Sequence, residues 1–413
     1  MSQPLSVAEY KATVATLLPA ARTTTLPLEQ CHGRVLAEDV TAGVSLPPFD
    51  NAAMDGYAAR AADIAGASEQ SPVELPVAAD IPAGRTDGPP LAPGTAHRIM
   101  TGAPIPDGAD TVVKVEDTDG GTERVRLFAA ASSGNSVRRA GEDVTGGDVA
   151  LREGTLLGAA QLGLAAAVGR AELAVKAGLR VLVLSTGTEL VLPPEPLRHG
   201  QIYESNSIML AAAIRALGCE VDVVRSVVDD VDTFRETLAK HAEHADLIVT
   251  SGGVSAGAYE VVKDALTSEG VRFTKVAMQP GGPQGSGTVN GTPIVTLPGN
   301  PVSVLVSYEV FLRPALLAAL GHVHVDRPVV RARLLERLVA PAGRRQFRRG
   351  FYSPPVAPGA GSVTGSVTGT VGPRGGPGSH LLAAFTQANC LIVLPEDVIE
   401  MDEGAEVDVV LLS

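Results

Sequence analysis

The chain has 413 residues, of which 45% are hydrophobic and only 3% aromatic, and its formal net charge is −13. This length exceeds what one hydrophobic core usually organises, so we expect two to four domains. The acidic balance argues against a nucleic-acid partner or an anionic membrane surface bound through bulk electrostatics. An anionic substrate therefore needs a local cluster of hydrogen-bond donors.

Three widely spaced cysteines, Cys31, Cys219 and Cys390, form no CxxC pair and do not indicate a disulfide framework. The N-terminus shows no basic segment followed by an apolar one, and no run of 18 apolar residues occurs. These features predict a protein of the reducing cytoplasm, with no membrane partner.

The first part of the chain combines two helices with short β-like segments. Residues 5–18 have apolar side chains at helical spacing. Between 34 and 151 lie short β-like pieces, such as 95–100 and 111–115, which Gly, Pro and Asp turns separate. Residues 155–169 are expected to form a helix that packs back on this part.

From residue 179 onward, apolar strands alternate with amphipathic helices. Strands are predicted at 179–185, 219–224, 245–250, 271–278 and 293–297. Helices are predicted at 206–218, 231–243 and 259–269, and after the pair Asn300–Pro301. This alternation is typical of βαβ units, which form a parallel sheet.

After residue 327 the pattern is β-like again. A stretch rich in Gly, Pro, Ser and Thr, residues 353–378, interrupts it. Such a composition cannot bury a core, so a loop is expected there. The fold class is thus α/β plus β, with a central parallel α/β sheet domain between N-terminal mixed or β domains and a C-terminal β-barrel-like domain.

Three glycine-rich loops follow directly on predicted strands of the α/β region, at 185–189, 251–257 and 298–303. In an open α/β sheet, ligands bind outside the carboxyl ends of the strands. Glycines let the backbone approach a ligand, and free N–H groups there attract anions. The three loops together predict a site for a phosphorylated anionic molecule.

Acidic residues beside these loops suggest a divalent metal. Glu189 lies in the first loop, Asp229 and Asp230 follow a strand, and Glu260 follows the second loop. A hard cation such as Mg²⁺ bridges carboxylate and phosphate oxygens. The alternative is that Asp229 and Asp230 start a solvated helix and that Glu260 only favours its helix dipole.

Three further segments in the N-terminal β region combine turn formers with hydroxyl or carboxylate groups, at 47–57, 100–103 and 141–143. The alternative for 47–57 is an ordinary loop, and the residues alone give the other two segments no functional assignment. His241 and His244 share a helix face without a nearby acid, and we interpret them as surface residues.

Taken together, these segments resemble the molybdopterin molybdenumtransferases of the MoeA type, to which the gephyrin E domain is similar. The resemblance runs through nearly the whole chain, in the same order. It rests on PPFDNAAMDGYA (47–58), RIMTGAPIP (98–106), RRAGEDV (138–144), STGTEL (185–190), YESNS (203–207), TSGGVSAG (250–257), LPGNPVS (297–303), QFRRG (346–350) and GSH (378–380).

The resemblance implies four domains and a homodimer with its active site at the subunit interface. The expected domains are 1–45 with 145–178 (discontinuous), an inserted β-rich domain at 46–144, a molybdopterin-binding α/β domain at 179–325 and a C-terminal β domain at 326–413. The implied reaction transfers molybdate, as substrate, to adenylylated molybdopterin and releases AMP, with Mg²⁺ as cofactor. A transient contact with a molybdopterin adenylyltransferase is also expected.

The resemblance also implies roles for individual residues. The expected catalytic residues are Asp55, Thr101, Asp143 and Glu189, and the expected metal ligands are Asp229, Glu260 and Glu189. The expected substrate-binding residues are Ser185, Thr186, Gly187, Ser251, Gly252, Gly253, Ser255, Lys275, Pro298, Gly299, Asn300, Arg349 and Ser379.

The chain departs from the family pattern at two places. Glu260 stands where the family usually has Asp, and the family's Lys-Pro-Gly-Lys-Pro turn is Gln279-Pro280-Gly281-Gly282-Pro283 here. Both turn lysines are therefore missing near the expected anion. Either Lys263, Lys275 and Arg349 supply enough charge, or affinity is lower, or the role has shifted. The alternative functions are a molybdopterin adenylyltransferase and a non-catalytic scaffold on the same fold.

Overall fold

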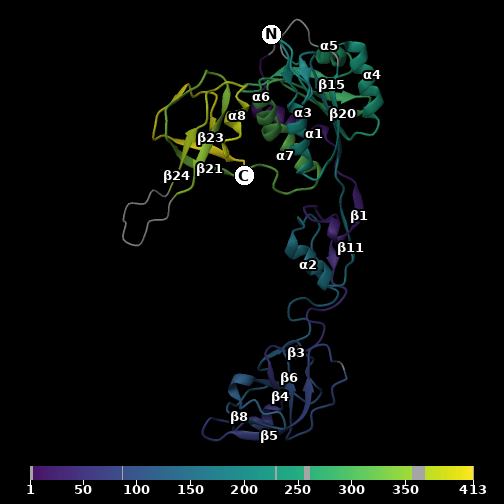
Figure 1. Cartoon of the computed structure of the whole chain (residues 1–413), viewed down its shortest axis with the longest axis vertical. Helices are drawn as coiled ribbons and strands as arrows, with labels where there is room; N and C mark the ends of the chain where they lie inside the picture. The colour runs from purple at the N-terminus through teal and green to yellow at the C-terminus, as the bar shows by residue number, and fades with distance from the viewer. Residues whose placement is uncertain (1–2, 86, 228–229, 255–260, 356–367, 413) are drawn as a thin grey trace. The chain divides into compact units, whose positions relative to one another are not determined.

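The computed structural model describes the chain except for residues 1–2, 86, 228–229, 255–260, 356–367 and 413. The chain divides into two compact units (Figure 1). Unit 1 comprises Met1–Thr24 and Lys176–Ser413, and unit 2 comprises Thr25–Val175. Each unit has hydrophobic clusters of its own.

Unit 2 begins and ends with chain segments that pair with each other. Its paired strands are β1 (Thr23–Pro27) with β11 (Glu172–Lys176), and β2 (Val40–Thr41) with β10 (Val149–Leu151). Helix α2 (Ala159–Ala167) lies beside them, as the sequence predicts. Buried Leu36, Leu157 and Val175 form the centre of this core. A short 3-10 turn, η1 (Leu28–Gln30), follows β1.

The inserted part of unit 2 is β-rich, as expected. A five-stranded sheet has the order β7-β4-β6-β5-β8, and β3 pairs separately with β9. The strands are β3 (Asn51–Ala52), β4 (Gly56–Ala59), β5 (Val73–Ile81), β6 (Ala96–Ile99), β7 (Thr111–Lys114), β8 (Arg124–Leu127) and β9 (Val137–Arg138). Two 3-10 turns, η2 (Ala61–Ile64) and η3 (Val115–Asp117), connect them. Tyr57, Ile64 and Leu127 are fully buried in its core.

Unit 1 contains a six-stranded sheet in the order β15-β12-β16-β20-β19-β17. Its strands are β12 (Arg180–Thr186), β15 (Glu220–Val227), β16 (Leu247–Ser251), β17 (Arg272–Lys275), β19 (Pro283–Val289) and β20 (Thr292–Leu297). The first four strands of that order are parallel, as predicted. The α/β region therefore has the expected core arrangement.

The other two strands of this sheet differ from the prediction. β19 runs antiparallel to β20, and β17 antiparallel to β19. The connection between β19 and β20 is too short for a crossover, so these neighbours can only form a hairpin. Because β19 has the glycine-rich sequence PQGSGTV, strand propensity does not reveal it.

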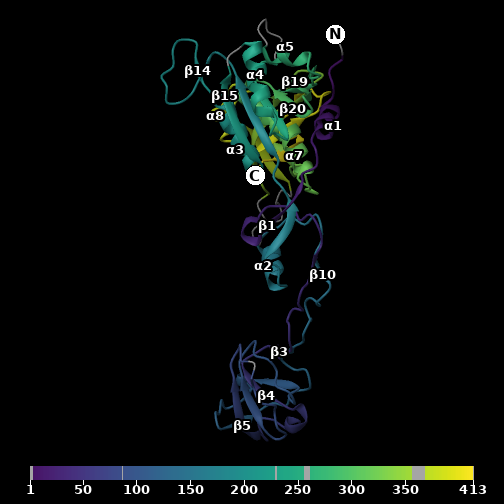
Figure 2. The ribbon, with the colours of Figure 1, turned by 90° about the vertical axis from the view of Figure 1, so that its right-hand side faces the viewer.

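Helices cover both faces of this sheet (Figures 1 and 2). The helices are α3 (Asn206–Arg215), α4 (Val231–Ala242), α5 (Val261–Thr267), α6 (Pro301–Ser307) and α7 (Arg313–Ala319), with a π-helical turn, η4 (Tyr308–Leu312), between the last two. Apolar residues of α3, α6 and α7 share one core cluster with Val181 and Val249. Those of α4 and α5 share another with Leu182 and Ile248. Alternate strand residues thus serve opposite layers.

Helix α1 (Val7–Leu17) packs on this α/β core. A capping box between Ser6 and Glu9 starts the helix. The buried Tyr10 ring meets Phe311 edge-on at 4.9 Å, and its hydroxyl donates to the Gly285 carbonyl at 3.0 Å. The first 24 residues therefore group with the central part of the chain, whereas we had expected residues 1–45 to belong with 145–178. The exact domain boundaries stay a prediction.

Among the described residues, one helical stretch has the length and apolar composition needed to cross a membrane. It is Pro301–Ala319, and 72% of it is buried inside the protein. This stretch corresponds to α6, η4 and α7, whose apolar side chains belong to the α/β core.

The C-terminal part of unit 1 is a closed five-stranded barrel, because β23 pairs with both β24 and β25. Its strands are β21 (Val329–Leu334), β23 (Arg345–Ser353), β24 (Gly369–Pro373), β25 (Cys390–Leu394) and β27 (Glu406–Leu411). The short strand β18 (Met278–Gln279) joins β23 in parallel. The remaining elements of unit 1 are β13 (Leu190–Val191), β14 (Ile202–Tyr203), β22 (Leu338–Val339), α8 (Leu382–Phe385) and β26 (Glu400–Met401).

The predicted loop at 353–378 is wrong in part, because β24 lies within it. Val371 is fully buried in the barrel core. A Cβ on Gly369 would lie 2.5 Å from the Tyr352 ring, so this glycine permits close strand packing. Residues 356–367 of the predicted loop lie outside the described residues.

Candidate active site

The three glycine-rich turns lie side by side at one edge of the α/β sheet. Strands β12, β16 and β20 are consecutive neighbours. In register, Ser185 pairs with Ser251, and Ser251 pairs with Leu297. Because the three strands are parallel, the turns that follow them leave the sheet at the same edge, as the sequence predicts.

Glycine is required in the middle turn. Gly252 has φ +99° and Gly253 has φ +67°, a region that residues with a Cβ rarely adopt. A Cβ on Gly252 would lie 3.0 Å from the Thr186 carbonyl oxygen, and one on Gly253 would lie 2.7 Å from Val262. The turn after β16 therefore packs tightly against the end of β12 and the start of α5, and a side chain at either glycine would disrupt this packing.

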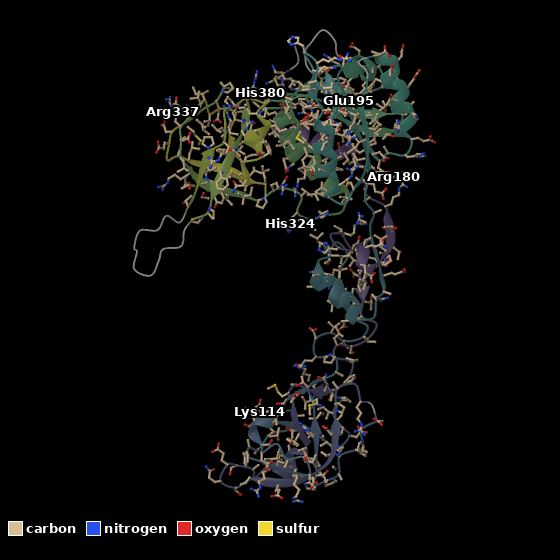
Figure 3. The ribbon with its side chains drawn as sticks, in the orientation of Figure 1. Lys114, Arg180, Glu195, His324, Arg337 and His380 are labelled. Carbon is tan, nitrogen blue, oxygen red and sulfur yellow. The ribbon has the colours of Figure 1, made fainter. Side chains whose placement is uncertain are left out.

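These turns border a cavity of about 1220 Å³. Its other walls come from the β14–α3 connection, the 278–283 turn and the C-terminal segment 377–382. Figure 3 shows His380 where the barrel meets the α/β domain. The α/β domain and the C-terminal barrel region of unit 1 thus contribute to one site.

Most of the predicted residues of unit 1 line this cavity. They are Thr186, Gly187, Glu189, Ser251, Gly252, Gly253, Lys275, Pro298, Gly299, Asn300 and Ser379. Three other predicted residues, Asp229, Ser255 and Glu260, lie outside the described residues. Within the described ranges no group of three His, Cys, Asp or Glu side chains is placed to hold a metal ion.

Two predicted contacts do not line the cavity. Ser185 is fully buried within β12, one residue before the cavity wall. Arg349 is buried, and its guanidinium donates to the carbonyls of Gly376 and, at 3.0 Å, Gly378. Burial, together with the charge of Arg348, lowers the Arg349 pKa. In this structure Arg349 shapes the loop that carries Ser379.

Two buried polar atoms in the cavity wall have no hydrogen-bond partner among the described residues. They are the Ser251 Oγ and the Asn206 Oδ1. The amide NH₂ of Asn206 donates to the Gly299 carbonyl at 2.7 Å. A carbonyl can only accept, so this bond fixes the amide orientation and leaves Oδ1 unpaired. Unpaired buried polar atoms favour a polar ligand at this wall.

The cavity wall carries charges of both signs. The basic side chains are Lys275, Arg344 and His380, and the acidic ones are Glu189 and Glu204. Glu204 is buried and accepts from the Ser207 backbone N–H at 2.8 Å and from its hydroxyl at 2.6 Å. Glu204 thus caps the start of α3, and Glu189 is the acid that stands exposed to the cavity.

Sequence reasoning did not assign Asn206, Arg344 or His380 to the site. Asn206 and His380 belong to segments that carried the resemblance, 203–207 and 378–380. Arg344 lies two residues before another such segment, 346–350. Contacts between residues far apart in the chain place them at the cavity, such as the hydrogen bonds Asn206–Gly299 and Val302–Ser379. Two features of the sequence could have pointed to these residues: the predicted helix start at Asn206 and the arginine-rich run that contains Arg344.

In unit 2, Asp55 and Thr101 form one hydrogen-bonded pair. Asp55 Oδ1 accepts from the Thr101 hydroxyl at 2.7 Å and from its backbone N–H at 2.6 Å. These two bonds, the hydroxyl first, lower the Asp55 pKa from 3.8. The sequence predicted both residues as catalytic, and the structure brings them together.

A second carboxylate of the same segment organises the neighbouring loop. Asp50 accepts from the Arg139 guanidinium at 2.6 Å and from the Ala140 N–H at 2.8 Å. The Asp143 backbone N–H donates to Leu46, and its side chain is exposed. The three predicted segments of unit 2 therefore converge around residues 46–55.

Three family descriptions match successive parts of the chain. "MoeA N-terminal region (domain I and II)" matches residues 5–169, "Probable molybdopterin binding domain" matches 182–318, and "MoeA C-terminal region (domain IV)" matches 331–412. The cavity therefore joins the second and third of these regions, and Asp55 and Thr101 belong to the first.

Curated relatives match along almost their full length. Molybdopterin molybdenumtransferase 2 of Mycobacterium tuberculosis is 53% identical over 411 residues, which cover 98% of each chain. Molybdopterin molybdenumtransferase 1 of the same organism is 39% identical, with 99% of each chain covered.

A solved structure agrees with both comparisons. The molybdopterin biosynthesis MoeA protein from Pyrococcus horikosii is 32% identical, with a TM-score of 0.82 and all of both chains covered. Family regions, relatives and structure thus agree over nearly every residue, including the segments that form the cavity. The chain belongs to the MoeA family of molybdopterin molybdenumtransferases, enzymes of molybdenum cofactor biosynthesis.

Proposed function

We propose that this enzyme transfers molybdate to adenylylated molybdopterin and releases AMP. The observation that carries the proposal is the cavity whose wall combines three glycine-rich turns with the basic side chains of Lys275, Arg344 and His380. A diphosphate-linked nucleotide and an oxyanion are both polar and anionic. The turns offer backbone N–H groups and hydroxyls to the diphosphate-linked nucleotide. The basic side chains offer positive charge to the oxyanion.

The unpaired polar atoms of the wall support a ligand with both donors and acceptors. The Ser251 hydroxyl can donate to a phosphate or ribose oxygen. The Asn206 Oδ1 can only accept, so its partner must be an N–H or O–H group of the ligand. A nucleotide-linked pterin carries groups of both kinds.

We include Mg²⁺ as the cofactor of this site. The exposed Glu189 carboxylate lines the cavity and has no protein partner within the described residues, which fits a ligand of a hard cation. Asp229 and Glu260 would complete the ligand set. The bound ion would offset the repulsion between the diphosphate and molybdate.

Asp55, Thr101 and Asp143 would reach the cavity from the partner subunit of a homodimer. In support, two large apolar side chains of the segment that carries Asp55 stand exposed in this chain, Phe49 at 46% and Met54 at 45%. Exposed apolar patches mark sites of contact between proteins. We place the enzyme in the cytoplasm, in transient contact with the adenylyltransferase that supplies its substrate.

The direct test is AMP release from adenylylated molybdopterin with molybdate and Mg²⁺. Glu189→Gln should lower kcat about 100-fold, the usual effect of losing a preorganised charged group. Glu195→Gln is the matched control, because Glu195 does not line the cavity although it lies in the same domain (Figure 3). Equal loss in both variants would contradict the role of Glu189, and no AMP from the unsubstituted enzyme would end the proposal.

Two further measurements separate the alternatives. Consumption of ATP on plain molybdopterin would indicate an adenylyltransferase, but the family matches extend well beyond the α/β domain that this activity needs. Unchanged cellular molybdoenzyme activity in an Asp55→Ala, Glu189→Ala double variant would instead indicate a scaffold.

A further inference from the structure

The 279–283 turn lines the cavity with all five of its residues. Its two ends belong to strands β18 and β19, whose pairing fixes them. The three residues between these strands are Pro280, Gly281 and Gly282. Gly281 has φ +94°, and a glycine can adopt more backbone conformations than any other residue. The conformation of the middle of the turn therefore depends on contacts from outside it.

One buried side chain makes such a contact. Gln284, the second residue of β19, is only 1% exposed. Its NH₂ group donates to the Gly281 carbonyl at 2.7 Å and to the Ser307 Oγ at 2.6 Å. Because a backbone carbonyl can only accept, the first bond fixes which end of the amide carries the N–H groups. Gln284 thus uses both of its N–H donors to connect the turn to Ser307.

Ser307 belongs to a second element that borders the cavity. It is the last residue of α6, the helix that follows the glycine-rich turn at 298–300, and it is fully buried. Ser303, four residues earlier, lines the cavity. Residues four apart lie on the same face of a helix. The Gln284 amide therefore connects the 279–283 turn to the helix face that borders the same cavity.

This connection has an energetic cost. The Gln284 Oε1 is buried and has no hydrogen-bond partner among the described residues. An unpaired buried oxygen destabilises a fold, whereas an apolar side chain of similar length, such as that of methionine, brings no such group. A buried glutamine that carries this cost, and whose donors connect two walls of a cavity, fits a positioning role better than a packing role.

We propose that Gln284 is a positioning residue that holds the 279–283 turn against α6 and so sets the distance between these two walls of the cavity. Gln284 itself does not line the cavity, so it acts through the turn. The inference rests on the proposed function, because it assigns this residue to the binding of adenylylated molybdopterin. Loss of the connection should weaken substrate binding more than it slows the chemical step.

Gln284→Met tests the hydrogen bonds while it keeps the length of the side chain. The KM for adenylylated molybdopterin should rise about tenfold, roughly the effect of losing one buried hydrogen bond, with a smaller change in kcat. Hydrogen exchange at the Gly281 and Gly282 N–H groups should become faster by a similar factor. Gln161→Met is the matched control, because Gln161 accepts from the Gly158 N–H at 3.2 Å but lies in unit 2 and does not line the cavity.

Gln284→Glu adds a pH dependence that a packing defect would not produce. A protonated carboxyl group can donate to the Gly281 carbonyl, whereas an ionised one has no donor. Burial beside a carbonyl oxygen raises the pKa of such a carboxyl above its usual range. The kcat/KM of Gln284→Glu, divided by that of Gln284→Met, should therefore rise about fivefold as pH falls from about 8 to about 6. The ratio cancels the titration of other cavity groups, such as Lys275 and His380, which both variants share.

The outcomes separate this inference from the proposed function. An unchanged KM in Gln284→Met, together with a pH-independent ratio, would overturn the inference and leave the proposed function intact. If the unsubstituted protein releases no AMP, the proposed function is overturned, and the Kd for AMP by equilibrium dialysis then decides the inference. A Kd about tenfold higher in Gln284→Met would keep it, and an unchanged Kd or no AMP binding at all would overturn it.

Ser307→Ala covers the case in which Gln284→Met does not fold. It removes one of the two acceptors and leaves the bond to the Gly281 carbonyl in place. The KM for adenylylated molybdopterin should then rise about threefold, less than in Gln284→Met. An unchanged KM and an unchanged Kd for AMP in Ser307→Ala would show that the turn keeps its place without α6, which overturns the inference.

Discussion

At the scale of single residues, hydrogen bonds decide which polar groups remain available for a ligand. Arg349 and Arg344 are five residues apart, yet the first is buried against carbonyls and the second is open to the cavity. Glu204 and Glu189 differ in the same way, because Glu204 is occupied by Ser207. Residue type alone does not distinguish the members of either pair.

The Asp55–Thr101 pair makes a prediction about acid stability. The Asp55 pKa is lowered from 3.8, so its bonds stabilise the fold above that pH, and this stabilisation is lost as pH falls through the lowered pKa. Thr101→Val removes the hydroxyl, the larger cause of the shift. The melting temperature of the Thr101→Val protein should therefore be below that of the parent at neutral pH. The difference between the two melting temperatures should narrow as pH falls below about 4.

Thr101→Ser is the control for this prediction, because it keeps the hydroxyl. Thermal melts of the three proteins across the acid range provide the measurement. A gap between Thr101→Val and the parent that stays constant with pH would show that the lost hydroxyl acts through packing and not through the carboxylate.

At the scale of elements, close backbone approach determines where glycine is required. Gly56 lies in β4, between β6 and β7 of the five-stranded sheet. A Cβ on it would lie 2.0 Å from the Val113 carbonyl oxygen. The same strand carries buried Tyr57 and follows directly on Asp55, so its placement also positions the predicted catalytic carboxylate.

Gly56→Ala should destabilise unit 2 by about 3 kcal/mol, because the strands cannot relax without breaking their ladder. Denaturant unfolding of the whole protein measures this. Gly66→Ala is the matched control, since Gly66 has no positive φ and a Cβ there would have no atom within 4 Å. A Gly56→Ala protein as stable as Gly66→Ala would contradict the packing seen around β4.

At the scale of the whole molecule, the proposed dimer makes a prediction about mixed subunits. If the site takes Asp55 from one subunit and Glu189 from its partner, neither Asp55→Ala nor Glu189→Ala homodimers should be active. After unfolding and refolding together in equal amounts, half of the dimers are mixed, and each has one intact site. About a quarter of the parent activity should then return.

The measurement is AMP release before and after the two variants are refolded together. Each variant unfolded and refolded alone is the control. No recovery, although mixed dimers form, would show that Asp55 and Glu189 act within the same subunit or that one of them is not required.

Local patterns in the sequence predicted much of unit 1. Neighbouring residues encode the apolar run of β12 and its glycine-rich turn. They also encode helix α1 and the start of α6 at Asn300–Pro301. The same holds for the shared edge of the three turns, because parallel βαβ units place carboxyl ends together. Strand β24 was missed, since its burial depends on barrel partners such as β21 and β23.

The sequence by itself determined the family, the alternating α/β region and the three glycine-rich turns at one edge of its sheet, because short-range backbone preferences and motif order carry that information. Only the tertiary structure decided that β19 and β17 run antiparallel, that Arg349 faces its own loop and that Arg344 stands beside the 279–283 turn. These outcomes depend on pairings between residues far apart in the chain. Such pairings are settled by competition for burial and for hydrogen-bond partners, which no local pattern records.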